Sequence, residues 1–382
     1  MITAIVTIVM FLIMVSLHEF GHYIVARVLD FKILEYAIGF GPAIFKREKN
    51  SILYSVRVVP FGGYCKFEGE DEESSDPRAF SNRPVWRRIL VVAAGGVFNI
   101  ILGFLIFMVI MPSLSPVSTN VINSVVENSY LEQCGVQPGD KIIEIDGKSI
   151  SFYNDITLYT SNLSGNEEID LTIKRNGEKL DFTVKPTEQK ITYNYTDEGV
   201  EYISAINGEE EMQLIPYSDN LLKQEDLIGK SQVQTRYIIG FVPQTQDITA
   251  LNIWGNAWNN TKFVVKLVYR SLWEMVTGKV GVEQMSGPVG IVNEVNNAVN
   301  QGSHSGLYVI NLMALLTINL GVFNLLPFPA LDGGRLFFMI VELIRRKPIP
   351  PEKEGMVHAI GIILLFALII FISFHDILKL ID

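Results

Sequence analysis

The stretch "MITAIVTIVMFLIMVSLHEFGH", residues 1–22, decides the fold of this chain. Its first seventeen residues carry no charge, and a helix that spans a bilayer needs about 20 apolar residues. His18, Glu19 and His22 follow directly at the end of this run. Ionisable side chains are costly in a bilayer and are kept there mainly for function. The stretch therefore predicts chemistry in or beside a membrane.

The composition agrees with a membrane protein. The chain has 382 residues, of which 48% are hydrophobic and 19% charged, and its mean hydropathy is positive, which is too apolar for an ordinary soluble protein. A net charge of −10 argues against a nucleic-acid partner. Three further apolar runs follow at 89–112, 306–326 and 355–376. We expect a polytopic α-helical membrane protein with four transmembrane helices in contact with the lipid bilayer.

The positive charges predict how these helices are oriented. Lys and Arg gather in the two loops 30–88 and 335–354, and loops rich in these residues face the cytoplasm. With four spans, the N-terminus and the long polar stretch 113–285 then face outward. The expected order is span 1–29, inner loop 30–88, span 89–112, outer domain 113–190, outer extension 191–285, third span with its motifs 286–334, inner loop 335–354 and span 355–376.

The histidines of the opening stretch have the spacing of a metal site. On a helix, residues four apart share one face, so His18 and His22 can bind one metal ion while Glu19 lies beside it as a general base. A catalytic zinc ion needs a third ligand and an open position. Asp332, in "NLLPFPALDGGRL", is the one ionisable residue between 306 and 334 and is expected at a similar depth. The alternative for Asp332 is an ordinary turn, because "LDGG" is good turn chemistry.

The outer domain and the inner loop each suggest a binding role. Residues 113–190 have the strand, helix and turn order of a PDZ-like α+β domain, which binds extended peptides at a sheet edge, although a simple spacer is the alternative. An acidic insert at 192–232 and an amphipathic helix at about 250–278 are expected in the extension. On the inner side, "SILYSVRVVPFGGYCKF", residues 51–67, predicts strand, turn and strand. We expect a membrane-associated β-hairpin whose edge holds an unwound substrate, or else a plain cytoplasmic hairpin.

Several single residues complete the sequence-based expectations. Small residues at 93–96 are typical of close helix packing in lipid. Asn99 is expected to support a metal ligand, and His358 is not expected to be one. The residues expected to contact substrate are Asn324, Pro327, Val58, Gly62, Gly63 and Tyr64.

Taken together, "HEFGH", "NLLPFPALDGG", "GFGP", "VPFGGYCKFEGE" and "SGPVGI" resemble the site-2 protease family of intramembrane zinc metalloproteases (peptidase family M50), in its bacterial RseP/RasP-like branch. The resemblance covers nearly the whole chain. It implies that His18, His22 and Asp332 bind Zn²⁺, that Glu19 is the catalytic acid and base, and that Asn324 helps to hold the substrate backbone. It also implies a bacterial inner-membrane enzyme that cuts transmembrane substrates such as anti-sigma factors or remnant signal peptides.

Two other classes of function remain open at this stage. One is a catalytically silent scaffold that binds membrane partners through its PDZ-like domain, although the intact Glu19 and metal-binding motif argue against it. The other is a metal transporter, which one cluster at a single depth does not support.

Overall fold

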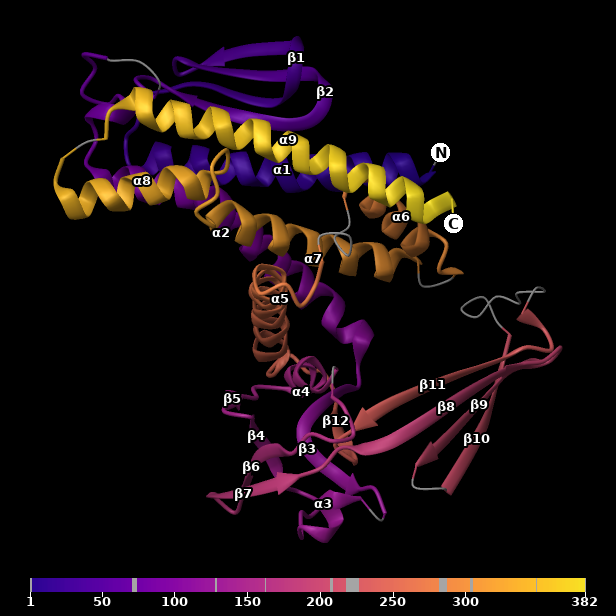
Figure 1. Cartoon of the computed structure of the whole chain (residues 1–382). Coiled ribbons are helices and arrows are strands. Elements are labelled where there is room, and N and C mark those ends of the chain that lie inside the picture. The colour runs from indigo at the N-terminus through magenta and orange to yellow at the C-terminus, as the bar shows by residue number, and fades with distance from the viewer. Residues whose placement is uncertain are drawn as a thin grey trace. The chain divides into compact units, whose positions relative to one another are not determined.

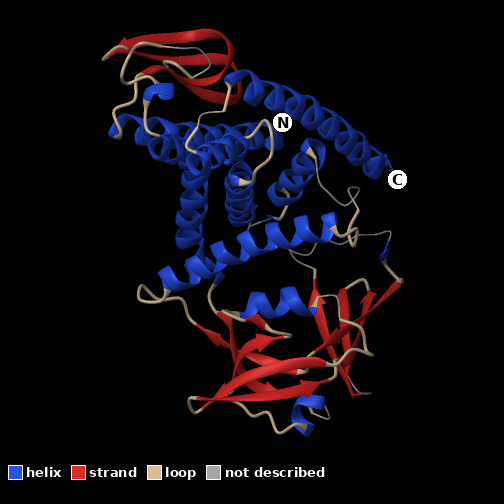
Figure 2. Cartoon of the chain, turned by 60° about the vertical axis from the view of Figure 1, so that its left-hand side comes forward, coloured by secondary structure: helices blue, strands red, loops and turns tan. Residues whose placement is uncertain are grey.

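A computed structural model describes residues 2–70, 74–127, 129–161, 163–206, 209–217, 227–281, 287–302, 305–347 and 349–381. Two compact units form: the first comprises Met1–Ile110, Asn260–Asn300 and Ser305–Asp382, and the second comprises Met111–Asn259 with residues 301–304. The first unit contains most of the long helices together with the sheet of β1 and β2, and the second consists mostly of strands (Figure 1, Figure 2).

Four of the described helices are long and apolar enough to cross a membrane, as the sequence predicted. The elements of the first unit are α1 (Ile2–Val28), β1 (Ile33–Lys49), β2 (Ile52–Phe67), a 3₁₀ turn at Phe80–Asn82, α2 (Val85–Ile110), α5 (Ile253–Val276, which begins in the second unit), α6 (Pro288–Val299), α7 (Ser305–Leu325), α8 (Asp332–Arg345) and α9 (Pro351–Ile381). A helix satisfies all its backbone groups internally, which is why apolar runs of this length are helical in lipid.

Glycines let three of these helices approach closely. Helix α2 packs against both α1 and α7 (Figure 1). A Cβ on Gly21 of α1 would lie 2.6 Å from the Ala94 carbonyl oxygen of α2, and a Cβ on Gly321 of α7 would lie 2.6 Å from the Gly96 carbonyl oxygen. The backbones therefore touch where larger residues could not fit. The small residues in the second span were predicted to pack in this way, and the structure confirms it.

The inner loop folds as a sheet of two long strands, with more structure than the sequence predicted. The turn between β1 and β2 lies at Asn50 and Ser51, which both have positive φ. Within β1, Tyr36 has partners on two sides, Tyr54 and Cys65. Residues 63–67 pair with 33–38, and along these pairs the residue number falls in β2 as it rises in β1. Residues 53–56 pair with 35–38, and along these pairs both residue numbers rise together. The chain thus reverses within β2, as the expected strand, turn and strand require.

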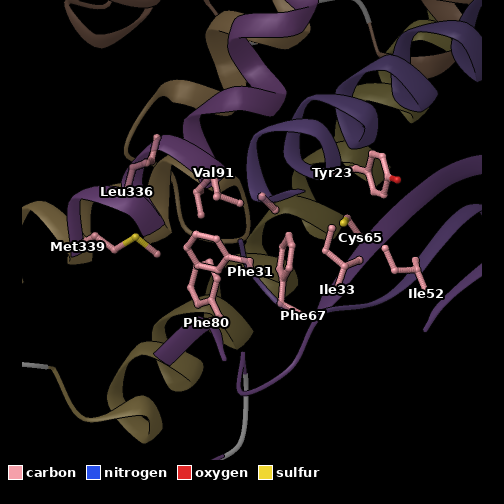
Figure 3. Close-up of a cluster of buried hydrophobic side chains, with 12 residues drawn as sticks. Tyr23, Phe31, Ile33, Ile52, Cys65, Phe67, Phe80, Val91, Leu336 and Met339 are labelled. Carbon is pink, nitrogen blue, oxygen red and sulfur yellow. The ribbon is translucent and has the colours of Figure 1, made fainter. Parts of the chain in front are cut away.

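An aromatic core holds this sheet against the helices. Phe31, Phe67 and Phe80 pack with ring centroids 5.6–6.3 Å apart, beside Val91 of α2 and Met339 of α8 (Figure 3). Burial of large apolar side chains is the main stabilising term in such a cluster. The core therefore joins the end of α1, the sheet, α2 and α8 into one support for the residues between them.

Helix α8 replaces much of a segment that was expected to be a loop. Residues 332–345 are helical, with Leu336 and Met339 buried. Two ion pairs fasten α8: Arg88 donates to Glu342 at 2.7 Å, and Arg335 donates to Glu70. The sequence expectation missed this helix because it begins directly at the turn-like "LDGG".

The second unit is rich in antiparallel strands. Its elements are β3 (Val117–Val125), α3 (Tyr130–Gln133), β4 (Lys141–Ile145), β5 (Lys148–Ser149), α4 (Tyr153–Thr160), β6 (Ile169–Arg175), β7 (Glu178–Val184), β8 (Thr187–Tyr195), β9 (Gly199–Ile206), β10 (Glu209–Pro216), β11 (Ser231–Ile238) and β12 (Phe241–Gln246), preceded by a 3₁₀ turn at Met111–Leu114. A hairpin turn at Asn176 and Gly177, which both have positive φ angles, joins β6 to β7.

The sheet that contains β3 includes a strand beyond residue 190, the expected boundary of the outer domain. One sheet has the order β12-β3-β4-β6-β7, and a second sheet has the order β10-β9-β8-β11. Strand β12, which pairs with β3, follows the whole insert in sequence. The expected acidic insert 192–232 contributes most of the second sheet, although 207–208 and 218–226 lie outside the described residues. The PDZ-like assignment itself stays a prediction.

Candidate active site

Helix geometry brings the two histidines of α1 together. Nε2 of His18 lies 3.2 Å from Nε2 of His22, and both residues are buried. This is what the i, i+4 spacing predicts. The rings meet edge to face, with their centroids 4.8 Å apart.

Asp332, at the start of α8, completes this cluster from a distant part of the chain. Its Oδ2 lies 3.1 Å from Nε2 of His18 and 3.2 Å from Nε2 of His22. These three are the one group of His, Cys, Asp and Glu among the described residues that could hold a metal ion. The alternative that Asp332 only serves a turn does not account for its contact with both histidines.

The donor atoms of the cluster fit a cation. The carbonyl oxygen of Val91 lies 2.9 Å from Nδ1 of His22, so Nδ1 carries the hydrogen and Nε2 of a neutral ring presents a lone pair. Oδ2 of Asp332 is buried and lacks a hydrogen-bond partner among the described residues. Either a proton on a ring or a metal ion must lie between these atoms. Tetrahedral zinc with bonds of about 2.0–2.1 Å separates its ligand atoms by roughly 3.3 Å, close to the spacing observed.

Two asparagines lie behind His18. Nδ2 of Asn99 on α2 and Nδ2 of Asn324 on α7 each lie 3.4 Å from Nδ1 of His18. If Nε2 of His18 faces a metal, Nδ1 carries a hydrogen that needs an acceptor. Oδ1 of Asn99 is buried and unpaired within the described chain, and turning this amide by 180° brings it to Nδ1 of His18. Oδ1 of Asn99 and the N–H at Nδ1 of His18 then each have a hydrogen-bond partner, which supports the role expected for Asn99.

Glu19 lies between the histidines and the sheet. The backbone N–H of Cys65 in β2 donates to its carboxylate, and a Cβ on Gly63 would lie 3.0 Å from its Cγ. The residues 63–65 therefore pass directly beside Glu19. A carboxylate in this place, one residue from His18 of the candidate metal cluster, can take up and return a proton.

The remaining residues expected to contact substrate differ in placement. Gly62 has positive φ at the reversal within β2, and Tyr64 lies under the Arg57 guanidinium, 5.3 Å from the ring centroid. Val58 is 55% exposed, and Pro327 is exposed. Asn324 is buried and contacts His18, so the structure places it nearer the metal cluster than the substrate role alone required.

Two features of the site were not recognised from the sequence. The Val91 carbonyl left no signal, because every residue offers one. Gly95 was expected only as a packing residue, but a Cβ there would lie 2.7 Å from Cε1 of His18 and collide with Nε2 of His22. The run of small residues at 93–96 was the available signal. Only knowledge of which residue faces the histidines would have distinguished Gly95 from its neighbours.

These features define a metallopeptidase: two histidines four apart, an acidic third ligand, and a glutamate beside them, on apolar helices. A sequence model of peptidase family M50 matches residues 6–368. Proteins named as zinc metalloproteases from Clostridium perfringens and Clostridium acetobutylicum are 32% and 31% identical, over 96% and 98% of this chain and 95% and 96% of their own. The zinc metalloprotease RasP of Oceanobacillus iheyensis is 29% identical over the full length of both chains.

The chain belongs to peptidase family M50. It is a multi-pass membrane zinc metalloprotease, and the cluster of His18, His22 and Asp332 fits its zinc site. The scaffold and transporter alternatives are therefore set aside for the chain as a whole.

Proposed function

We propose that this metalloprotease hydrolyses peptide bonds within or near the transmembrane segments of single-span membrane proteins. The observation that carries the proposal is the position of the zinc cluster on α1, a helix apolar enough to span a membrane, beside the spans α2 and α7. Anti-sigma factors and remnant signal peptides are the substrate classes that we expect. Lys and Arg concentrate in the loops 30–88 and 335–354, which would therefore face the cytoplasm of a bacterial cell. The zinc site would lie toward that side, and the N-terminus and the β-rich second unit would face outward.

We assign the chemistry to His18, His22, Asp332 and Glu19, with Asn99 in support. His18, His22 and Asp332 would hold the ion, which when bound lowers the pKa of water and polarises the scissile carbonyl. Glu19 takes the proton from the attacking water and delivers it to the departing amine. Asn99 keeps Nδ1 of His18 hydrogen-bonded so that the ring cannot turn away from the ion.

Substrate binding is proposed at the free edge of β2. Residues 63–67 pair with 33–38 on one side and have no other strand partner among the described residues. Because the Cys65 N–H donates to Glu19, this free edge faces the catalytic residue. A substrate helix that unwinds can add to this edge as a strand, which exposes its peptide bonds. An apolar cavity of about 690 Å³ is lined in part by Met14, one helical turn before His18 on α1, and by Phe323, the residue before Asn324 on α7.

A peptide ligand for the second unit is a separate part of the proposal. Strand β12 forms the edge of its sheet, and a cavity of about 590 Å³ lies between Phe241 and Val242 of β12 and Tyr153, Ile156 and Thr160 of α4. An edge strand next to a helix is the arrangement in which extended peptides are captured. We propose that a peptide segment of a membrane protein binds there.

The test of the proteolytic function uses purified full-length enzyme and a single-span reporter protein. Wild-type enzyme should cleave the reporter, lose activity with a chelator and regain it with zinc. Glu19→Gln should keep its zinc but not cleave, because the amide cannot accept the proton. Cleavage by Glu19→Gln, or by chelated wild-type enzyme, would refute the assignment.

The test of the strand-addition step uses Tyr64→Pro, which removes a backbone N–H from residues 63–67 and disfavours the strand conformation that the proposed edge requires. Cleavage should fall while the zinc content stays at the wild-type level. Val58→Pro tests the rest of the hairpin in the same way. If Tyr64→Pro cleaves the reporter normally, the substrate does not bind at this edge.

A further inference from the structure

The turn that carries Asp332 has backbone hydrogen bonds from the N–H groups of Leu326, Phe328 and Leu331, whereas the N–H of Ala330 is held by a side chain from another helix. Residues 326–331 connect α7 to α8, and Pro327 and Pro329 within them lack an N–H. Ala330 has a φ of 76°, a left-handed conformation that residues with a side chain rarely adopt. A segment of this kind keeps its shape only when neighbouring elements hold it. The position of the Asp332 carboxylate therefore depends on what contacts the turn from outside.

Helix α9 supplies those contacts. The backbone N–H of Ala330 donates to Nδ1 of His358 at 3.1 Å. One turn further along α9, a Cβ on Gly361 would lie 2.8 Å from the Pro329 carbonyl carbon and 3.0 Å from its Cα, so this helix has a groove that the turn enters. On the other side of Asp332, a Cβ on Gly334 would lie 3.2 Å from Cε1 of His358. His358 thus touches the chain both before and after Asp332.

The direction of the hydrogen bond determines which nitrogen of His358 is protonated. Nδ1 accepts from Ala330, so it must be the nitrogen without a hydrogen, and Nε2 carries the hydrogen. Nε2 is buried without a hydrogen-bond partner among the described residues, and Oε1 of Glu354, one turn earlier on α9, lies 3.9 Å away. The ring therefore has a carboxylate on its N–H side and the turn on its acceptor side.

We propose that His358 is a positioning residue for the zinc site: its Nδ1 holds the Ala330 N–H, and so keeps the Asp332 carboxylate against His18 and His22. The last span is then part of the catalytic apparatus and not only an anchor. This inference rests on the proposed role of Asp332 as a zinc ligand. It also explains a costly polar residue in an apolar helix that is not itself a ligand.

The experiment measures how fast zinc leaves the full-length, zinc-loaded enzyme in detergent when a chelator is added. His358→Asn places its side-chain oxygen where Nδ1 was and should release zinc within about twofold of the wild-type rate. His358→Gln reaches one carbon too far, and His358→Leu cannot accept at all. Both should release zinc about tenfold faster, the lower end of the effect of losing a group that orients a metal ligand. With excess zinc, kcat should fall and KM should stay the same.

Controls separate this inference from the assignment of the site. His375→Leu, a matched change in α9 nearer the end of the chain, should release zinc at the wild-type rate. Asp332→Ala should bind zinc far more weakly, and if it does not, the proposed zinc site is wrong. If Asp332→Ala loses zinc but His358→Leu releases it at the wild-type rate, the positioning role of His358 is refuted and the proposed zinc site stands. Equal acceleration by His358→Asn and His358→Leu would also refute it, because loss of packing would then explain both.

Discussion

Replacement of Gly95 by alanine is the most direct probe of the zinc site from the opposite helix. The new Cβ would collide with Nε2 of His22 and lie 2.7 Å from Cε1 of His18. Ordinary van der Waals contact starts at 3.4 Å, so the His18 ring must move by about 0.7 Å. Zinc–ligand distances in proteins vary by only about 0.2 Å. The histidines cannot make this movement and keep one ion between them.

The rings also have little freedom to move aside. His22 is held by the Val91 carbonyl at 2.9 Å, and His18 lies against Asn99 and Asn324. We therefore expect Gly95→Ala to weaken zinc binding by at least 100-fold, which corresponds to about 2.7 kcal/mol. The measurement is a zinc competition titration with a chromogenic chelator, together with cleavage of the single-span reporter.

Gly103→Ala is the matched control, because it adds the same methyl group to the same helix. There the Cβ meets the Ile318 side chain and, at 3.1 Å, the Ala314 carbonyl oxygen, far from the histidines. Thermal stability should fall for both variants, by about 1–3 kcal/mol of overpacking, but only Gly95→Ala should lose zinc. Wild-type zinc affinity in Gly95→Ala would show that α2 does not face the histidines as described, and equal zinc loss in Gly103→Ala would attribute the effect to general helix packing.

Two further predictions concern buried polar groups. Asn99→Leu removes the amide beside His18 with little change in volume, so zinc affinity should fall about tenfold; an unchanged titration would contradict this. Asp140 is held by Arg175 at 2.6 and 2.8 Å. Burial raises the pKa of Asp140. Arg175 and the Gln137 N–H together lower this pKa by more than burial raises it, so the pKa lies below its ordinary value. Its stabilisation is therefore complete above about pH 3.9 and is lost as the pH falls through the folded-state pKa. Asp140→Asn should cost about 2 kcal/mol at pH 7, and the difference in thermal unfolding should shrink in acid; a constant difference would refute the ion pair.

Local patterns were sufficient for the membrane-spanning helices and for half of the site. Four apolar runs predicted the four described helices that are long and apolar enough to cross a membrane, because lipid allows a single chain segment few other structures. The spacing of His18 and His22 placed them on one face for the same local reason. The sequence was less informative where structure depends on distant partners: α8 begins at a turn-like motif, and β12 joins its sheet only after a long insert.

The sequence by itself determined that this chain spans a membrane, carries a glutamate and a pair of histidines with the spacing of a zinc site, and belongs with metalloproteases. Asp332 could be nominated only as the one acidic or basic residue in its segment and from the family resemblance. The tertiary structure decided that its carboxylate meets both histidines, that Gly95 makes room for them, and that His358 holds the turn. The physical reason is that helix periodicity acts over a few residues, whereas a metal site needs side chains from several helices at distances that only packing can set.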